Sequence, residues 1–198
     1  MEEQPLELLL VRHGESTANR DGTEEEDPEL TELGLEQARR MAPWVAANFH
    51  LVAIYSSPLR RARHTAEILA QAVGTEVRFR EDLREVDFEL AMHMPRFSDP
   101  ALAIGAEGRP LKQMSEEYIR FHDRIVQAAR EIVNEHRSGT IAIVAHGGVI
   151  SVLLRSIFGA HQTSVFADNT SLVLLRWMND RWYMVFANRT EHLRSPSK

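Results

Sequence analysis

The sequence predicts an α/β protein, built as a three-layer α/β/α sandwich around a mainly parallel sheet with one antiparallel edge strand. Buried strands alternate with amphipathic helices, which is typical of parallel sheets covered on both faces. Two of the buried strands, at residues 6–11 and 140–145, are each followed within two residues by a histidine, and a glycine comes directly after it. A short turn at Asn179-Asp180 separates two further strands and indicates an antiparallel hairpin.

The first half of the chain is expected to supply two strand–helix pairs. The apolar run at 6–11 predicts a strand, and Thr31 predicts the cap of a helix whose apolar residues recur at three- and four-residue steps. A second strand is expected over residues 51–57. The helix after it is expected over 58–73, because proline is tolerated at the first helical position. Residues 75–79 alternate as a short strand.

The second half is expected to hold a long helix and the rest of the sheet. Apolar side chains recur at helical spacing over 112–136, and the strand at 140–145 is followed by an apolar helix that runs to Phe158. The last two strands are expected over 170–177 and 182–187.

The segment at residues 88–112 is irregular and rich in proline and glycine, which indicates a lid or insertion over the site. The residues that select the substrate are expected there. No internal repeat or linker divides the chain, so residues 1–198 are expected to form one domain.

The composition limits the classes of function. With a net charge of −6 and no cysteine among 198 residues, nucleic-acid binding is not expected, and disulfide and thiolate chemistry are excluded. The apolar runs are too short to cross a membrane and the acidic first residues do not form a signal peptide, so we expect a cytoplasmic protein with no membrane partner. Any affinity for anions must come from a local cluster of cations.

Four such side chains follow the carboxyl ends of expected strands: Arg12, His13, Arg61 and His146. Ligands bind at that edge of open α/β sheets, so we expect these side chains to converge. Guanidinium groups pair bidentately with phosphate oxygens. The cluster therefore predicts a site for a phosphate dianion, with His13 as a candidate nucleophile.

The acidic run Glu24-Glu25-Glu26-Asp27-Pro28 is expected on a solvated rim, because carboxylates next to an anion site would repel the substrate. Arg60 and Arg63 are expected to be solvated helix residues. Trp177 and Trp182 are interpreted as packing within the hairpin.

These residues lie in blocks that resemble those of the histidine phosphatase superfamily, which has the phosphoglycerate-mutase-like fold. In that family's order the blocks are Leu10-Val11-Arg12-His13-Gly14-Glu15-Ser16 with Asn19, Leu30-Thr31-Glu32-Leu33-Gly34, Ser56-Ser57-Pro58-Leu59-Arg60-Arg61-Ala62, Leu83-Arg84-Glu85-Val86-Asp87-Phe88, Val144-Ala145-His146-Gly147-Gly148 and Asn169-Thr170-Ser171. A lone Arg-His-Gly is weak evidence, whereas blocks in order from residue 8 to about 193 are specific.

The resemblance implies a role for each residue. His13 would attack phosphorus and become phosphohistidine, while Arg12, Arg61 and His146 stabilise the phosphoryl group. Glu85 would protonate the leaving oxygen and then activate water.

Further substrate contacts are implied for Asn19 and Gly147, and no metal or other cofactor is required. The sequence departs from the family at Phe88-Glu89-Leu90-Ala91, so Asp87, and then Glu89, remain alternatives to Glu85 as the acid/base.

The implied activity is that of a metal-independent phosphomonoesterase of the histidine acid phosphatase type. It would act on a small phosphorylated metabolite, as a monomer or homodimer. The alternatives are a cofactor-dependent phosphoglycerate mutase and a catalytically silent protein that binds phosphorylated ligands. The compact chain favours hydrolysis, because mutases carry a longer insertion before the second histidine.

Overall fold

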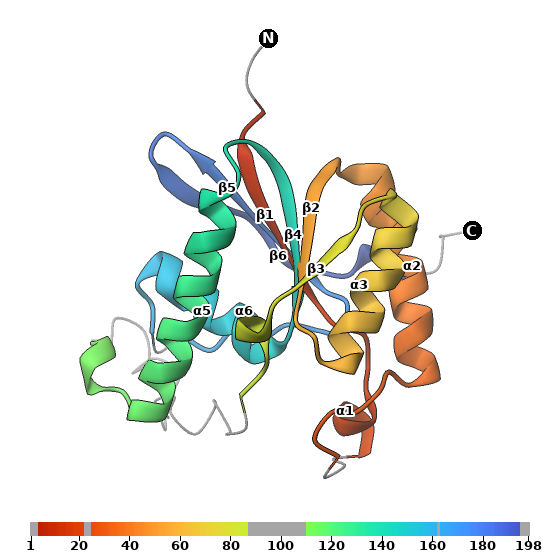
Figure 1. Cartoon of the computed structure of the whole chain (residues 1–198), viewed down its shortest axis with the longest axis horizontal. Helices are drawn as coiled ribbons and strands as arrows, with labels where there is room; N and C mark the ends of the chain where they lie inside the picture. The colour runs from red at the N-terminus through yellow and green to blue at the C-terminus, as the bar shows by residue number, and fades with distance from the viewer. Residues whose placement is uncertain (1–3, 22–24, 87–109, 162, 195–198) are drawn as a thin grey trace.

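A computed structural model describes residues 4–21, 25–86, 110–161 and 163–194 (Figure 1). Its six strands form one sheet in the order β3-β2-β4-β1-β5-β6. The strands are β1 Leu6–Arg12, β2 Leu51–Ser56, β3 Val77–Phe79, β4 Gly139–Ala145, β5 Leu172–Met178 and β6 Arg181–Arg189. β1, β2, β3 and β4 pair in parallel, β5 runs antiparallel to β1, and β6 pairs antiparallel with β5 at the edge. The predicted fold class is confirmed.

Helices cover both faces of the sheet, with α2 and α3 on one face and α5 and α6 on the other (Figure 1). The helices are α1 Thr17–Asp21, α2 Glu32–Asn48, α3 Arg60–Val73, α5 Glu116–Asn134 and α6 Gly147–Phe158, with short 3-10 turns at Glu81–Leu83, Leu111–Gln113 and Glu191–Leu193. Along β1, Leu8 and Leu10 pack toward α5 and α6, whereas Leu9 and Val11 pack toward α2 and α3. This alternation makes β1 apolar on both faces and buries it at the centre of the sheet.

Several boundaries differ from the expectation. α3 begins at Arg60 rather than at Pro58, because Leu59 has an extended backbone and takes the N-cap position. The segment between β1 and α2 contains the short helix α1. α5 is shorter than 112–136, since a 3-10 turn precedes it. Most of the expected lid, residues 87–109, lies outside the described residues.

The carboxyl-terminal hairpin is confirmed by its turn. Asn179 and Asp180 have φ angles of 49° and 58°, the left-handed pair that a two-residue hairpin turn requires. The rings of Trp177 and Trp182 meet edge to face at 5.4 Å across the hairpin, as expected. None of the described helices has the length and apolar character needed to cross a membrane.

The pairing of β1 with β4 positions the two histidines. Arg12 lies opposite Ala145 in the parallel register, and the His13 N–H donates to the Ala145 carbonyl oxygen at 3.0 Å. Because His146 is the next residue after Ala145, both histidines leave the same edge of the sheet side by side.

Candidate active site

His13 is buried, with 3% of its surface exposed. Its Nδ1 lies 2.6 Å from the carbonyl oxygen of Gly14. A carbonyl oxygen only accepts, so Nδ1 carries the proton and Nε2 keeps its lone pair. Burial, reinforced by the positive charges of Arg61 and Arg12, lowers the pKa of His13 to about 3. His13 is therefore neutral near pH 7, which is the form a nucleophile requires.

His146 is fully buried between β4 and α6, and its ring centroid lies 5.1 Å from that of His13. Burial lowers the pKa of His146 well below its usual value, so this ring is also neutral. Its Nε2 lies 2.8 Å from Ser57 Oγ, which also accepts the Leu59 N–H at 3.3 Å. The hydroxyl proton of Ser57 is then available for Nε2. This arrangement leaves Nδ1–H of His146 as a donor, and Nδ1 has no partner among the described residues.

Two arginines border the histidines. Arg12 ends β1 and donates from Nη1 to the carbonyl oxygen of Ala167, while its buried Nε has no hydrogen-bond partner within the described chain. Arg61 is the second residue of α3, and its buried Nη1 makes no hydrogen bond to any described residue. Burial lowers the pKa of both guanidinium groups, and the charge of Glu85 opposes this. Buried donors that carry positive charge suit a bound anion.

Glu85 receives two backbone N–H groups. Its Oε2 accepts from Gly148 at 2.9 Å, in the first turn of α6, and its Oε1 accepts from Val86 at 3.1 Å. Burial raises the pKa of Glu85, although the two N–H groups and the nearby arginines oppose the change. A raised pKa makes the protonated form more available near neutrality, as a general acid requires. The alternatives Asp87 and Glu89 lie outside the described residues.

Glycines allow close packing around these side chains. A Cβ on Gly148 would lie 2.3 Å from Glu85 Oε1, so the carboxylate occupies the space of the missing side chain. A Cβ on Gly14 would lie 2.4 Å from the carbonyl oxygen of Gly34, where α2 begins. The Leu30–Gly34 block therefore supports the loop that follows His13.

Thr65 ties that loop to the turn that carries Arg61. Its Oγ1 accepts the Gly14 N–H at 3.1 Å and donates to the Arg61 carbonyl oxygen at 2.8 Å. Sequence reasoning gave Thr65 no role. Its position at i+4 from Arg61, one helical turn along, was the available signal.

Asn19 lies on α1, and its Oδ1 accepts from the N–H and hydroxyl groups of Ser16. Asn169 Nδ2 also donates to Asn19 Oδ1, at 3.2 Å, and to the His13 carbonyl oxygen, at 3.1 Å. Asn169 thus links Asn19 to the site, a role that sequence reasoning did not assign. Gly147 opens α6, and a Cβ there would meet Arg12 Nε at 3.9 Å, which places the start of α6 beside Arg12.

The acidic segment, described over residues 25–28, lies beside the site, and Glu25 and Glu26 are exposed there, as expected for a solvated rim. Asp27 Oδ1 accepts the Arg60 N–H at 2.8 Å and lies 3.9 Å from Arg61 Nη1. Arg60, expected to be solvated, forms ion pairs with Glu25 and Glu29. The positive charges of these arginines offset the repulsion that the carboxylates would exert on a phosphate group.

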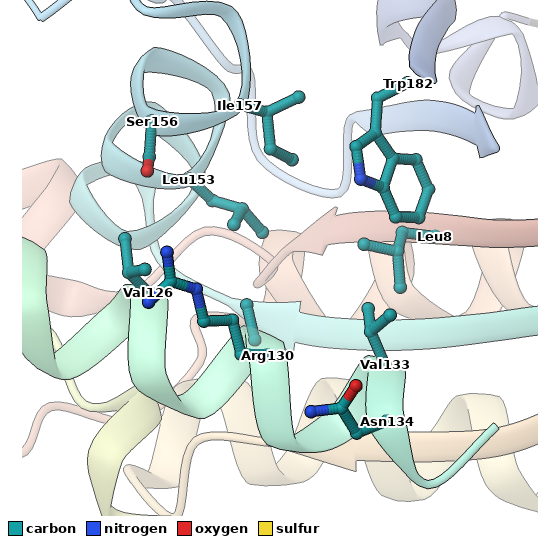
Figure 2. A pocket seen from close by; sticks show the side chains of 10 residues that line it. Leu8, Val126, Arg130, Val133, Asn134, Leu153, Ser156, Ile157 and Trp182 are labelled. Atoms are coloured by element: carbon teal, nitrogen blue, oxygen red, sulfur yellow. The ribbon is translucent and has the colours of Figure 1, made fainter. Parts of the chain in front are cut away.

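A cavity of about 190 Å³ opens next to Arg61 and Glu85. A larger cavity of about 280 Å³ lies between α5, α6 and β6, and Figure 2 shows Leu8, Arg130 and Trp182 on its walls. The larger cavity is lined by none of the candidate site residues. We therefore identify the smaller one as part of the candidate active site.

Together, the fold and the site define an α/β protein in which two arginine side chains and two buried, neutral imidazoles meet at the carboxyl edge of the sheet. The family model described as histidine phosphatase superfamily (branch 1) matches residues 8–190. The chain belongs to this superfamily.

Named relatives include phosphatases. A protein of Arabidopsis thaliana named metal-independent phosphoserine phosphatase is 28% identical over 202 residues, which cover 92% of this chain and 83% of the relative. A putative phosphoserine phosphatase of Hydrogenobacter thermophilus is 28% identical, with coverage of 94% and 97%.

Solved structures share the fold. A phosphoserine phosphatase mutant from Entamoeba histolytica, in complex with phosphoserine, superposes with a TM-score of 0.71 at 24% identity, covering 96% of this chain and 100% of that one. A phosphoglycerate mutase from Bacillus anthracis gives a TM-score of 0.74 at 19% identity, covering 96% of each chain.

Proposed function

We propose that this chain hydrolyses small phosphomonoesters through a phosphohistidine on His13. In the first step Nε2 of His13 attacks phosphorus, the bond to the ester oxygen breaks, and protonated Glu85 gives its proton to the departing alcohol. Arg12, Arg61 and Nδ1–H of His146 bind the phosphoryl oxygens. The Asn19 side-chain amide and the first turn of α6 at Gly147 add neutral donors.

In the second step water attacks the phosphohistidine. The carboxylate of Glu85 takes a proton from this water, the bond between phosphorus and Nε2 breaks, and inorganic phosphate leaves. Glu85 is protonated again and His13 is neutral again, so the cycle closes without an added reactant. The cations of the site offset the phosphoryl charge throughout, as phosphoryl-transfer catalysis requires.

The hydrogen bond from His13 Nδ1 to Gly14 carries this proposal, because it fixes the tautomer that leaves Nε2 nucleophilic. The raised pKa of Glu85 supports its part as the acid. The names of the relatives support a small phosphorylated metabolite as substrate. We further propose that residues 1–198 act as one domain.

The test is a hydrolysis screen over phosphomonoesters with a His13→Ala control. We expect release of inorganic phosphate and, in a rapid alkaline quench, a phosphoenzyme that survives alkali, is lost on acidification and is absent from His13→Ala. Full activity of His13→Ala would rule the mechanism out. Transfer of phosphate between hydroxyls in the presence of a bisphosphoglycerate, without release, would instead identify a mutase. Binding without any turnover would identify a silent phospho-ligand-binding protein.

A further inference from the structure

The cavity beside Arg61 and Glu85 is the place for the alcohol portion of the substrate. Arg61 faces the phosphoryl group in the proposed mechanism, and Glu85 protonates the ester oxygen, so the alcohol must extend past these two residues. The cavity has a volume of about 190 Å³ and is lined by both of them. The described residues leave room there for the alcohol of a small phosphomonoester.

The walls of this cavity carry both signs of charge. Glu25 and Glu26, from the acidic segment, and Arg84, from the chain before Glu85, line it. Glu25 pairs with Arg60 at 3.2 Å. Among the described residues, the guanidinium of Arg84 forms one long ion pair, 3.4 Å from Nη1 to Glu81. Glu26 makes no ion pair or hydrogen bond with any residue that the structure describes, so its charge is not offset there.

The acidic segment is held in place independently of any substrate. Asp27 bonds the first N–H of α3, and Arg60 pairs with carboxylates on both sides of it, Glu25 and Glu29. Pro28 is buried beneath the segment. The residues on either side of Glu26, Glu25 and Asp27, are therefore both tied to α3, which keeps Glu26 at the cavity wall.

We propose that this cavity selects phosphomonoesters whose alcohol carries an ammonium group, with Glu26 as the specificity-determining residue, and that Arg84 adds a preference for a carboxylate on the same alcohol. The inference rests on the proposed hydrolysis at His13. A hydroxy acid would pair with Arg84 but would bring no positive charge to Glu26. A zwitterionic amino-acid alcohol pairs with both walls, so it is the substrate class that this cavity fits best.

The experiment compares kcat/KM for four probes that form two matched pairs. O-phosphoserine and 3-phosphoglycerate differ only in an amino group against a hydroxyl group, and both carry a carboxylate. O-phosphoethanolamine and 2-hydroxyethyl phosphate differ in the same way and lack the carboxylate. For the unmodified chain we expect the amine to be preferred in both pairs by about threefold to fivefold, the range of a solvent-accessible ion pair.

Variants assign the preference to a side chain. Glu26→Gln is expected to reduce the amine preference to near unity in both pairs, and Arg84→Gln to reduce the preference for phosphoserine over phosphoethanolamine. Glu67→Gln, an exposed carboxylate further along α3, is the matched control and should leave every ratio unchanged. Raising the salt concentration should weaken the amine preference of the unmodified chain and not that of Glu26→Gln.

The outcomes separate this inference from the hydrolase proposal. Hydrolysis of all four probes with no amine preference, or a Glu26→Gln variant whose ratios match those of Glu67→Gln, overturns the subsite and leaves the hydrolase intact. No phosphate release from the four probes or from p-nitrophenyl phosphate overturns the hydrolase and the subsite together.

Discussion

Gly148→Ala should disable the proposed general acid while leaving the phosphoryl site intact. The added Cβ would lie 2.3 Å from Glu85 Oε1, whereas ordinary contacts begin at 3.4 Å, so the carboxylate must move by about 1 Å. A displacement of that size at a reacting group costs on the order of a hundredfold in rate, within the range that a general acid contributes. The fold should tolerate the change, because Gly148 lies in the first turn of α6 with no positive φ.

The assay compares kcat for an alkyl phosphate and for p-nitrophenyl phosphate. The alkoxide needs a proton to leave and nitrophenolate does not, so the loss should be about a hundredfold for the first and under tenfold for the second. Glu85→Gln should give the same pattern. Glu67→Gln, at an exposed carboxylate on α3, is the control, and no loss is expected on either substrate. Equal losses on both substrates in Gly148→Ala would refute the assignment of Glu85 as the acid.

Three further predictions concern groups around the nucleophile. Ser57→Ala removes the hydrogen-bond partner of His146 Nε2 and should lower kcat/KM about tenfold in steady-state assays. Ser57→Thr keeps the hydroxyl group and should keep most of the activity. Thr65→Val breaks both hydrogen bonds that join Gly14 to Arg61, so it should lower the free energy of unfolding, measured in urea, by about 1–3 kcal/mol. Thr65→Ser keeps the hydroxyl group and should keep the stability. His13 has a folded pKa of about 3, below its unfolded value of 6.5, so the unfolded state binds more protons at mild acidity. Its contribution to stability is present above pH 6.5 and falls by about 1.4 kcal/mol from pH 7.5 to pH 5.5. In urea denaturation, the free energy of unfolding of His13→Asn should fall between the two pH values by about 1.4 kcal/mol less than that of the unmodified chain. An equal fall in both proteins would contradict a neutral buried imidazole.

The convergence of the two histidines could be predicted because it follows from local patterns. Both β1 and β4 are continuous apolar runs, which predicts central parallel strands, and each ends at a histidine. Parallel neighbours end at the same edge, so His13 and His146 had to meet once the strands were recognised. Arg61 follows from the same rule, since α3 leaves the carboxyl end of β2.

The supporting contacts could not be predicted, because they join segments far apart in the chain through packing rather than through pattern. Ser57 meets His146 across 89 positions, and Asn169 meets the His13 carbonyl across 156. A serine or asparagine in a motif has many possible partners, and only the fold selects one. The contact that supports Glu85 as the acid/base is also of this long-range kind, because the N–H of Gly148 reaches Glu85 across 63 positions.

The acidic segment is exposed, as a charge argument from sequence predicts, but it lies nearer the site than repulsion alone would place it. Such an argument counts the repulsion between the carboxylates and a phosphate group but leaves out the counter-ions of the carboxylates. Here those counter-ions are Arg60, which pairs with Glu25, and Arg61, which lies near Asp27. With Arg60 offsetting Glu25 and Glu29, the segment attaches to α3 at the surface of the protein. The local charge that remains is that of Glu26, which does not face the phosphoryl group but lines the cavity for the alcohol. An acidic segment next to an anion site is therefore consistent with phosphate binding, provided that the substrate brings a positive charge on its other end.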